Sequence, residues 1–141
     1  WDTAARVNSR DGETLSAAAL HYVGTPLVGQ VAEREGDFVS AVYAGTGMLL
    51  IKRNVIERMI AAYPELRYSA IHAYPSTKRS PSTQYALFEC MVEEGTGIYL
   101  SEDFAFCHRW RALGGKIWLD TASKLSHTGP HRFVGNTAPR Y

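Results

Sequence analysis

The sequence predicts a mixed α/β fold, and three observations carry that prediction. Short runs of apolar and β-branched residues, which are typical of buried strands, recur along the chain. Between them lie segments in which apolar residues return every three or four positions, as on one face of a helix. Turns rich in glycine connect the two kinds of segment. We therefore expect a layer structure in which helices flank a sheet.

The 141 residues are near the most common size of one domain, so we expect a single domain or a fragment of one. Residues 1–37 are weakly patterned, with short Ala-rich helices expected at Leu15–Leu20 and Leu27–Arg34. The clearer pattern begins with a strand expected at Phe38–Ala44. Met48–Lys52 (MLLIK) is apolar almost throughout and predicts a second, buried strand.

A helix is expected to start at Asn54, where NVIE reads as a capping box. In that motif Asn54 accepts from the backbone N–H near Glu57, and Glu57 reaches back. Pro64 ends the helix, because the residue before a proline avoids the α region. A long loop at Leu66–Pro81 and a strand at Tyr85–Val92 (YALFECMV) follow.

The last helix is expected to begin after Ser101, a favourable N-cap residue. Three of its side chains share one face and are expected in the core: Phe106, Trp110 and Leu113. Gly114-Gly115 ends the helix by supplying the left-handed C-cap conformation. Short strands at residues 116–120 (KIWLD) and 123–127 (SKLSH) precede a loop punctuated by Gly and Pro, residues 127–136.

Composition excludes several classes of protein. The net charge of +1 provides no electrostatic footprint for nucleic acid or an anionic membrane. The longest apolar run, Gly47–Ile51, is far shorter than the roughly 20 residues of a membrane span. No signal peptide is visible after Trp1, so we expect a cytoplasmic protein. Cys90 and Cys107 are expected as reduced thiols, although one bridge between them stays open.

Two adjacent carboxylates, Glu102 and Asp103, open the last helix. Acids in a first turn are stabilised by the positive end of the helix dipole, by roughly 0.3–1 kcal/mol each, which accounts for them without any chemistry. The alternative is a general base, because a carboxylate at a helix N-terminus is rigidly aimed and can take a proton from a hydroxyl. The local sequence leaves both interpretations open.

The remaining motifs are weak by themselves. Ala44–Gly47 (AGTG) lacks the spacing of a dinucleotide or P-loop motif, and a bulge or tight strand connection accounts for it. Gly129-Pro130 between His127 and His131 excludes a helical metal-binding pair. His127 is then a hydrogen-bonded loop residue or a single ligand to a hard divalent ion. Four basic residues that can contact phosphate are expected to be solvated surface instead: Lys78, Arg79, Arg109 and Arg111.

Taken together, three blocks resemble a known family: YAGTGMLLIKRNVIERM…YPELRY, then LFECMVEEGTGIYLSEDFAFCHRWRALGGKIWLD, then KLSHTGPHRFVGN. In this order and spacing they resemble the C-terminal half of bacterial family 2-like glycosyltransferases with the GT-A fold. The resemblance covers about residues 38–136. It implies a partial GT-A-type mixed sheet flanked by helices, and transfer of a sugar from a nucleotide-sugar donor to an acceptor hydroxyl.

The resemblance also implies roles for individual residues. Asp103 matches the base for the acceptor hydroxyl in inverting members, and Glu102 would help to position the acceptor. The small residues that enter the strand beside the sugar-nucleotide pocket match Gly45, Thr46 and Gly47. Trp118 is expected to bind substrate. His127 matches a histidine that approaches the divalent metal or the diphosphate.

One departure from the family is large. The family's first half carries a nucleotide-binding unit and an Asp-x-Asp that holds Mn²⁺ or Mg²⁺, and this chain has no Asp-x-Asp. We therefore expect the chain to be the acceptor-side half of an enzyme, lacking the N-terminal nucleotide-binding half, inactive alone and without a metal of its own. Such a half-sheet would expose an apolar face, through which a homo-oligomer is expected to form.

Two other classes of function were considered. A non-catalytic carbohydrate- or partner-binding module would use its acids only as helix caps and would stack sugar rings on aromatic residues: Tyr68, Tyr74, Trp110 and Trp118. A hydrolase that uses Glu102 and Asp103 as its pair is disfavoured. Adjacent helical residues point roughly 100° apart and do not straddle one bond.

Overall fold

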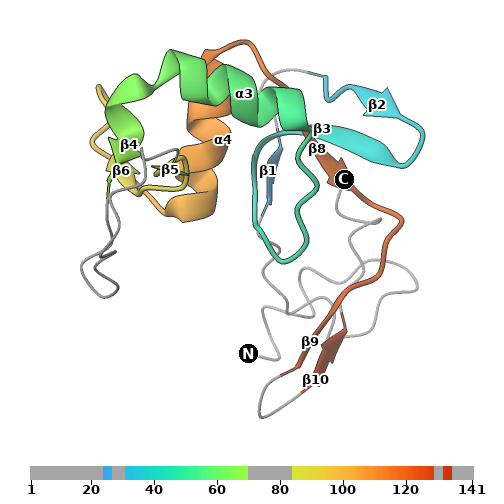
Figure 1. The fold of residues 1–141 in the computed structure, drawn as a ribbon. Helices are drawn as coiled ribbons and strands as arrows, with labels where there is room; N and C mark the ends of the chain where they lie inside the picture. The colour runs from blue at the N-terminus through green and yellow to red at the C-terminus, as the bar shows by residue number, and fades with distance from the viewer. Residues whose placement is uncertain (1–23, 27–30, 70–83, 129–131, 135–141) are drawn as a thin grey trace. The chain divides into compact units, whose positions relative to one another are not determined.

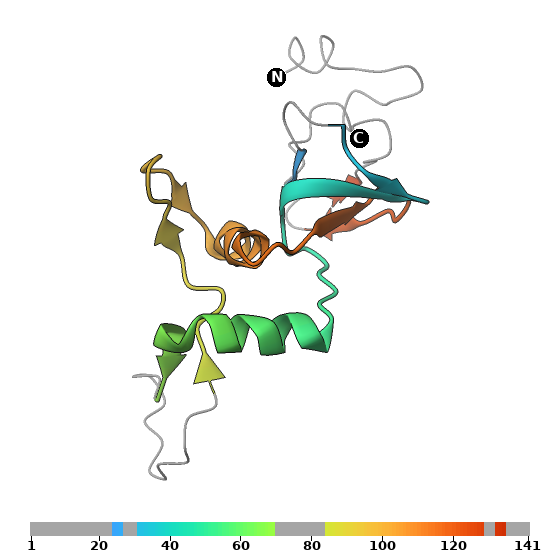
Figure 2. The same cartoon turned by 90° about the horizontal axis from the view of Figure 1, so that it is seen from above.

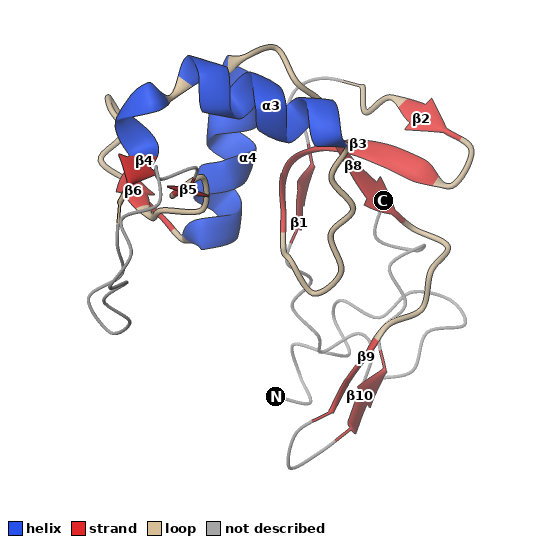
Figure 3. Ribbon diagram, in the orientation of Figure 1, coloured by secondary structure: helices blue, strands red, loops and turns tan. Residues whose placement is uncertain are grey.

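The computed structural model describes residues 24–26, 31–69, 84–128 and 132–134 (Figure 1). The described part is mixed α/β, with two α-helices and small antiparallel sheets (Figure 3). The chain divides into two compact units. The first combines Trp1–Val42 with Ile117–Tyr141, and the second is the continuous segment Tyr43–Lys116.

The sheet of the first unit is organised by β3 (Phe38–Ala44), the strand expected from the sequence. It pairs with β1 (Gly24–Pro26), β2 (Arg34–Glu35) and β8 (Ile117–Asp120). The turn between β2 and β3 is closed by Gly36, whose φ of +58° is a left-handed conformation that glycine adopts readily. On the other edge Phe38 pairs with Asp120 and Ala41 with Ile117, so the strand expected at 116–120 is confirmed.

A second antiparallel pair in this unit consists of β9 (Ser126–Thr128) and β10 (Arg132–Val134), with His127 opposite Phe133. The loop expected at 127–136 is therefore wrong in part. Phe133 and Val134 have high strand propensity, and this outweighs the nearby Gly and Pro. Residues 123–125 are not in a strand, so the strand expected at 123–127 starts later.

The second unit contains both helices, α3 (Arg53–Ala62) and α4 (Glu102–Ala112), which Figure 2 shows from above. Its other elements are short: η1 (Pro64–Leu66), β4 (Arg67–Tyr68), β5 (Gln84–Tyr85), β6 (Met91–Val92) and β7 (Tyr99–Leu100). Strand β4 pairs with β5 and β6 pairs with β7, both antiparallel.

Polar side chains join the two helices to each other. The Tyr63 hydroxyl donates to the Arg109 carbonyl at 2.9 Å. The guanidinium of Arg58 donates to the Leu113 carbonyl at 3.0 Å and lies 4.8 Å from the ring centre of Trp110, a cation–π distance. These contacts place the C-terminal half of α3 against the C-terminal half of α4.

The expected core of α4 is largely confirmed. Phe106 and Trp110 are buried, with Ala105, Cys107 and Met59, whereas Leu113 is half-buried. The Phe106 ring stacks on Phe88 with centroids 4.4 Å apart. Burial of these side chains supplies the hydrophobic stabilisation of this unit.

The start of α3 differs from the expected capping box. The N-cap is Lys52, no side chain caps the helix, and Asn54 lies within the first turn. Glu57 instead pairs with Arg53 one turn earlier, at 2.8 Å. The predicted end at Pro64 is confirmed, since Tyr63 is the C-cap.

Three expected elements are wrong where the structure describes them. Met48–Lys52 does not pair with any described strand, and most of it is exposed: Met48 is 74% and Leu50 93% exposed, whereas Ile51 is half-buried. The strand expected at Tyr85–Val92 is broken by a turn at Leu87-Phe88 into β5 and β6. The helix expected at Leu27–Arg34 is absent from residue 31 onward, because Arg34 pairs with Val39 in a hairpin. The helix expected at Leu15–Leu20 lies outside the described residues.

Candidate functional site

The carboxylate of Asp103 is fixed at the start of α4. Strand β7 ends at Leu100, Ser101 is the N-cap in extended conformation, and Glu102 begins the helix. One oxygen of Asp103, Oδ1, accepts from the Ser101 hydroxyl at 2.6 Å and from the Phe104 amide at 2.9 Å. Asp103 is half-buried and Glu102 is exposed.

Ser101 therefore occupies the predicted N-cap position but acts differently from an ordinary cap. Its hydroxyl donates to Asp103 where a cap would accept from a helical amide. Both bonds end on Oδ1, so Oδ2 receives no hydrogen bond from a described residue. A half-buried carboxylate held in this way can accept a proton from an incoming hydroxyl.

The end of β3, at Tyr43 and Ala44, meets the first turns of α4. The ring of Tyr43 stacks on that of Phe104, with centroids 4.8 Å apart and 15° between the planes. One turn further along α4, the buried Cys107 thiol lies 3.8 Å from the Ala44 carbonyl oxygen, which accepts its S–H. The structure thus brings the turn that holds Asp103 beside the end of β3.

Beyond Ala44 the segment opens toward solvent. Gly45 is half-buried, and Thr46 and Gly47 are exposed. A Cβ added to Gly47 would meet nothing within 4 Å, and its φ is ordinary, so no described neighbour requires glycine there. The space around Gly47 is therefore open, and Thr46 and Gly47 face solvent.

The other two predicted site residues lie in the first unit. Trp118 is half-buried on β8, opposite Ser40 of β3. His127 is in β9, opposite Phe133. The roles expected for both residues stay predictions. In the described ranges, no group of three or more His, Cys, Asp or Glu side chains is placed to hold a metal ion.

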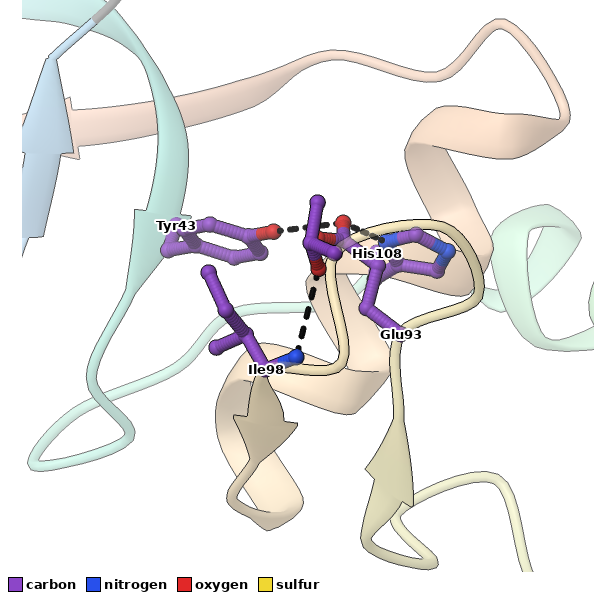
Figure 4. A network of polar contacts seen from close by, with 5 residues as sticks. Tyr43, Glu93, Ile98 and His108 are labelled. Carbon is purple, nitrogen blue, oxygen red and sulfur yellow. Dashed lines mark hydrogen bonds and ion pairs between the residues drawn. The ribbon is translucent and has the colours of Figure 1, made fainter.

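Sequence reasoning missed a polar network centred on Glu93 (Figure 4). The Glu93 carboxylate accepts from the Thr96 hydroxyl on Oε2 and pairs through Oε1 with His108 Nδ1 at 3.2 Å. The Tyr43 hydroxyl donates to the same Oε1 at 3.5 Å, near the upper limit for a hydrogen bond. Residues 43, 93 and 108 come from three separate segments, so no spacing in the sequence indicates that they meet.

The surroundings of Glu93 and Tyr43 shift the pKa values of both side chains. The hydrogen bond from Thr96 is the main cause that lowers the pKa of Glu93, with His108 and Tyr43 adding to it. Burial is the main cause that raises the pKa of the Tyr43 phenol, and the negative charge of Glu93 raises it further. Glu93 is thus held as a carboxylate, while Tyr43 stays protonated.

Arg109 was expected as solvated surface, and Trp110 would stack on sugar rings only in the alternative of a binding module; both are buried. Arg109 Nη1 donates to the carbonyls of Leu87 and Glu89 at 3.0 and 2.7 Å, so it secures a turn and is not solvated surface. The Trp110 ring is buried, and its Nε1–H donates to the Lys116 carbonyl at 3.1 Å, so this ring is unavailable for stacking on a sugar. Lys78, Arg79 and Tyr74 lie outside the described residues.

Comparisons with protein-family models, curated proteins and solved structures find no match to this chain. Over the described residues, no helix is both long enough and apolar enough to cross a membrane.

Proposed function

We propose that these residues belong to a glycosyltransferase of the GT-A type, which moves a sugar from a nucleotide-sugar donor to an acceptor hydroxyl. The observation that carries the proposal is the fixed carboxylate of Asp103, held by Ser101 and Phe104 in a helix turn that packs on Tyr43 at the end of β3. The family resemblance suggests the reaction, and this geometry supports the assignment of the base.

The chemical step at Asp103 is a proton transfer coupled to bond formation. The acceptor O–H proton passes to the Asp103 carboxylate while the acceptor oxygen attacks the anomeric carbon of the donor. The bond between that carbon and the diphosphate oxygen breaks on the opposite side, and the electron pair leaves with the nucleoside diphosphate. The product has inverted configuration at the anomeric carbon.

Gly45, Thr46 and Gly47 would leave room for the donor, Glu102 would orient the acceptor, and Trp118 would contact substrate. The resemblance assigns Mn²⁺ or Mg²⁺ to an Asp-x-Asp that this chain does not contain, with His127 approaching the ion. The described residues include no group of three or more His, Cys, Asp or Glu side chains that would complete a metal site.

The test is to replace Asp103 with Asn in the complete encoded protein. Asp103→Asn keeps the shape and the acceptor oxygen but cannot take a proton, so we expect transfer to fall by about 100-fold or more with donor binding retained. Release of nucleoside diphosphate from a panel of nucleotide sugars measures it, with exposed Glu94→Gln as the matched control. Turnover of Asp103→Asn equal to that of the wild type would remove Asp103 from this role.

A carbohydrate-binding module remains the second candidate, because one observation favours it. Tyr99 on β7 is 66% exposed and stands opposite Val92, which is also exposed. The pKa of Tyr99 is raised, with hydrogen bonding to Cys90 as the main cause, and most of the side chain stays open to solvent. Exposed tyrosine rings can stack on the apolar face of a sugar.

Saccharide binding separates the two candidates. A binding module would bind simple saccharides without any donor, would weaken with Tyr99→Ala, and would be indifferent to Asp103→Asn. Isothermal titration calorimetry with the wild type, Tyr99→Ala and Asp103→Asn, combined with the diphosphate-release assay, distinguishes these outcomes.

A further inference from the structure

The turn that carries Glu93 is firmly built. Glu93 N donates to the Ile98 carbonyl at 2.8 Å, and Gly97 N donates back to the Glu93 carbonyl at 3.0 Å. Gly95 and Gly97 have φ values of +87° and +70°, which other residues rarely adopt. The Thr96 hydroxyl donates to Glu93 and also accepts from the Ile98 amide at 3.3 Å. The Glu93 carboxylate therefore has a defined position before any other segment reaches it.

Two distant parts of the second unit converge on that carboxylate. His108 arrives from the second turn of α4, and Tyr43 arrives from the end of β3, 50 residues away in sequence (Figure 4). The side chains of Glu93 and His108 are only 20% and 29% exposed, so their attraction is partly shielded from water. One carboxylate thus connects the strand end to the helix.

The connection continues to Asp103 through Tyr43. Its ring stacks on Phe104, whose amide donates to Asp103 Oδ1. If Tyr43 moved, its ring would no longer stack on Phe104, and the turn that holds Asp103 would be less firmly fixed. His108 holds the same helix from the following turn.

We propose that Glu93 is a positioning residue for the Asp103 site: through Tyr43 and His108 it holds the first two turns of α4 against the end of β3. This inference rests on the proposed function, because the effect of positioning is measured on transfer. Glu93 itself does not touch the reacting atoms.

The decisive variant is Glu93→Gln in the complete encoded protein, with Glu94→Gln as control. The amide keeps the size of the side chain but loses the charge that pairs with His108, so we expect kcat to fall about tenfold and the donor KM to stay within about twofold. The phenol pKa of Tyr43 should fall, because the negative charge that raises it is gone. Tyr43 is identified in the NMR titration by the signal that Tyr43→Phe lacks.

The outcomes distinguish a failure of the proposed function from a failure of this inference. A wild-type protein without transfer refutes the proposed function and this inference with it. Wild-type transfer that is unchanged in Glu93→Gln, with the Tyr43 pKa lowered, overturns the inference and leaves the proposed function standing. If Glu93→Gln does not fold, Thr96→Val removes the anchoring hydroxyl at an exposed position. We expect it to lower kcat about threefold at constant donor KM, and an unchanged kcat again overturns the inference.

Discussion

At the scale of single residues, the two glycines after α4 have different physical roles. Gly114 has a φ of +76° and ends the helix in the left-handed conformation that the sequence predicts. Gly115 has no such angle. A Cβ built on it would overlap the indole ring of Trp110, so the position requires the absence of a side chain. A glycine pair in the sequence indicates a helix end, but only the packing shows which glycine serves which purpose.

Replacing Gly115 tests this distinction. Gly115→Ala should destabilise the protein by about 1–3 kcal/mol, because the new methyl displaces the buried Trp110 ring. Gly47→Ala is the control, since its Cβ would meet no atom within 4 Å, and it should change stability little. Urea unfolding followed by tryptophan fluorescence measures both, and equal stabilities would contradict the packing at Gly115.

At the scale of elements, α4 is held by polar contacts that cannot be predicted from its sequence. Charged residues are rarely fully buried, so Arg109 reads as surface. In the structure it is 7% exposed, and it donates to two carbonyls of the 87–90 segment. This contact stabilises the turn that divides the expected strand at Tyr85–Val92.

Arg109→Met should destabilise the protein by about 1–3 kcal/mol. The replacement fills similar space but leaves the carbonyls of Leu87 and Glu89 without their donor, a cost that the relief of a buried charge offsets only in part. Arg53→Met is the control, because the ion pair of Arg53 with Glu57 is exposed and worth about 0.3–0.5 kcal/mol. Chemical denaturation measures the free energy of unfolding of both variants. A similar loss of stability in the two variants would argue against the role of Arg109.

The end of β8 is stabilised in a pH-dependent way by Asp120. Its carboxylate accepts from the Ser123 hydroxyl, the main cause that lowers its pKa, and from the amides of Ser123 and Ala122. A lowered pKa in the folded state means that the stabilisation is complete above the usual value of 3.8. It is lost as the pH falls through the lower folded-state value.

Asp120→Asn should therefore reduce stability at neutral pH, and the difference from the wild type should shrink at a pH well below the usual value of 3.8. Denaturant unfolding at the two pH values measures it. A difference that persists in acid would show that Asp120 acts through something other than its ionised carboxylate.

Local patterns predicted those elements whose neighbours in sequence determine them. Helix α3 ends at Pro64, α4 begins after Ser101, and β3 and β8 lie where alternation and apolar content indicate. The strand predictions for Met48–Lys52 and Tyr85–Val92 were wrong, because an apolar run does not reveal whether a partner strand exists. For the candidate site, the sequence indicated Glu102 and Asp103. It could not indicate Glu93, Tyr43 and His108, since contacts across 15 and 50 residues depend on tertiary packing.

At the scale of the whole molecule, exposed apolar side chains bear on association. Met48 and Leu50 are among the most exposed large apolar residues of the second unit. Water contact with such side chains is unfavourable, and covering them favours association. They are a second candidate surface for self-association, beside the apolar sheet face expected from the sequence, which stays a prediction.

The double variant Met48→Ser with Leu50→Ser should lower concentration-dependent association relative to the wild type. Sedimentation velocity over a range of concentrations measures this, with Val31→Ser as control, because Val31 is 95% exposed in the other unit. An equal reduction by the control would mean that general surface hydrophobicity, and not this segment, drives association.

The boundaries of the second unit show where it is inserted into the rest of the polypeptide chain. Its first residue, Tyr43, follows Val42 in β3, and its last, Lys116, precedes Ile117 in β8. Ala41 and Ile117 face each other across one ladder, so the polypeptide leaves and re-enters the sheet at adjacent points. The 74 residues from 43 to 116 are therefore a continuous insert between two strands that pair at Ala41 and Ile117. Such an insert could be excised as a cassette, bridged by a tight hairpin, or grafted into another host sheet.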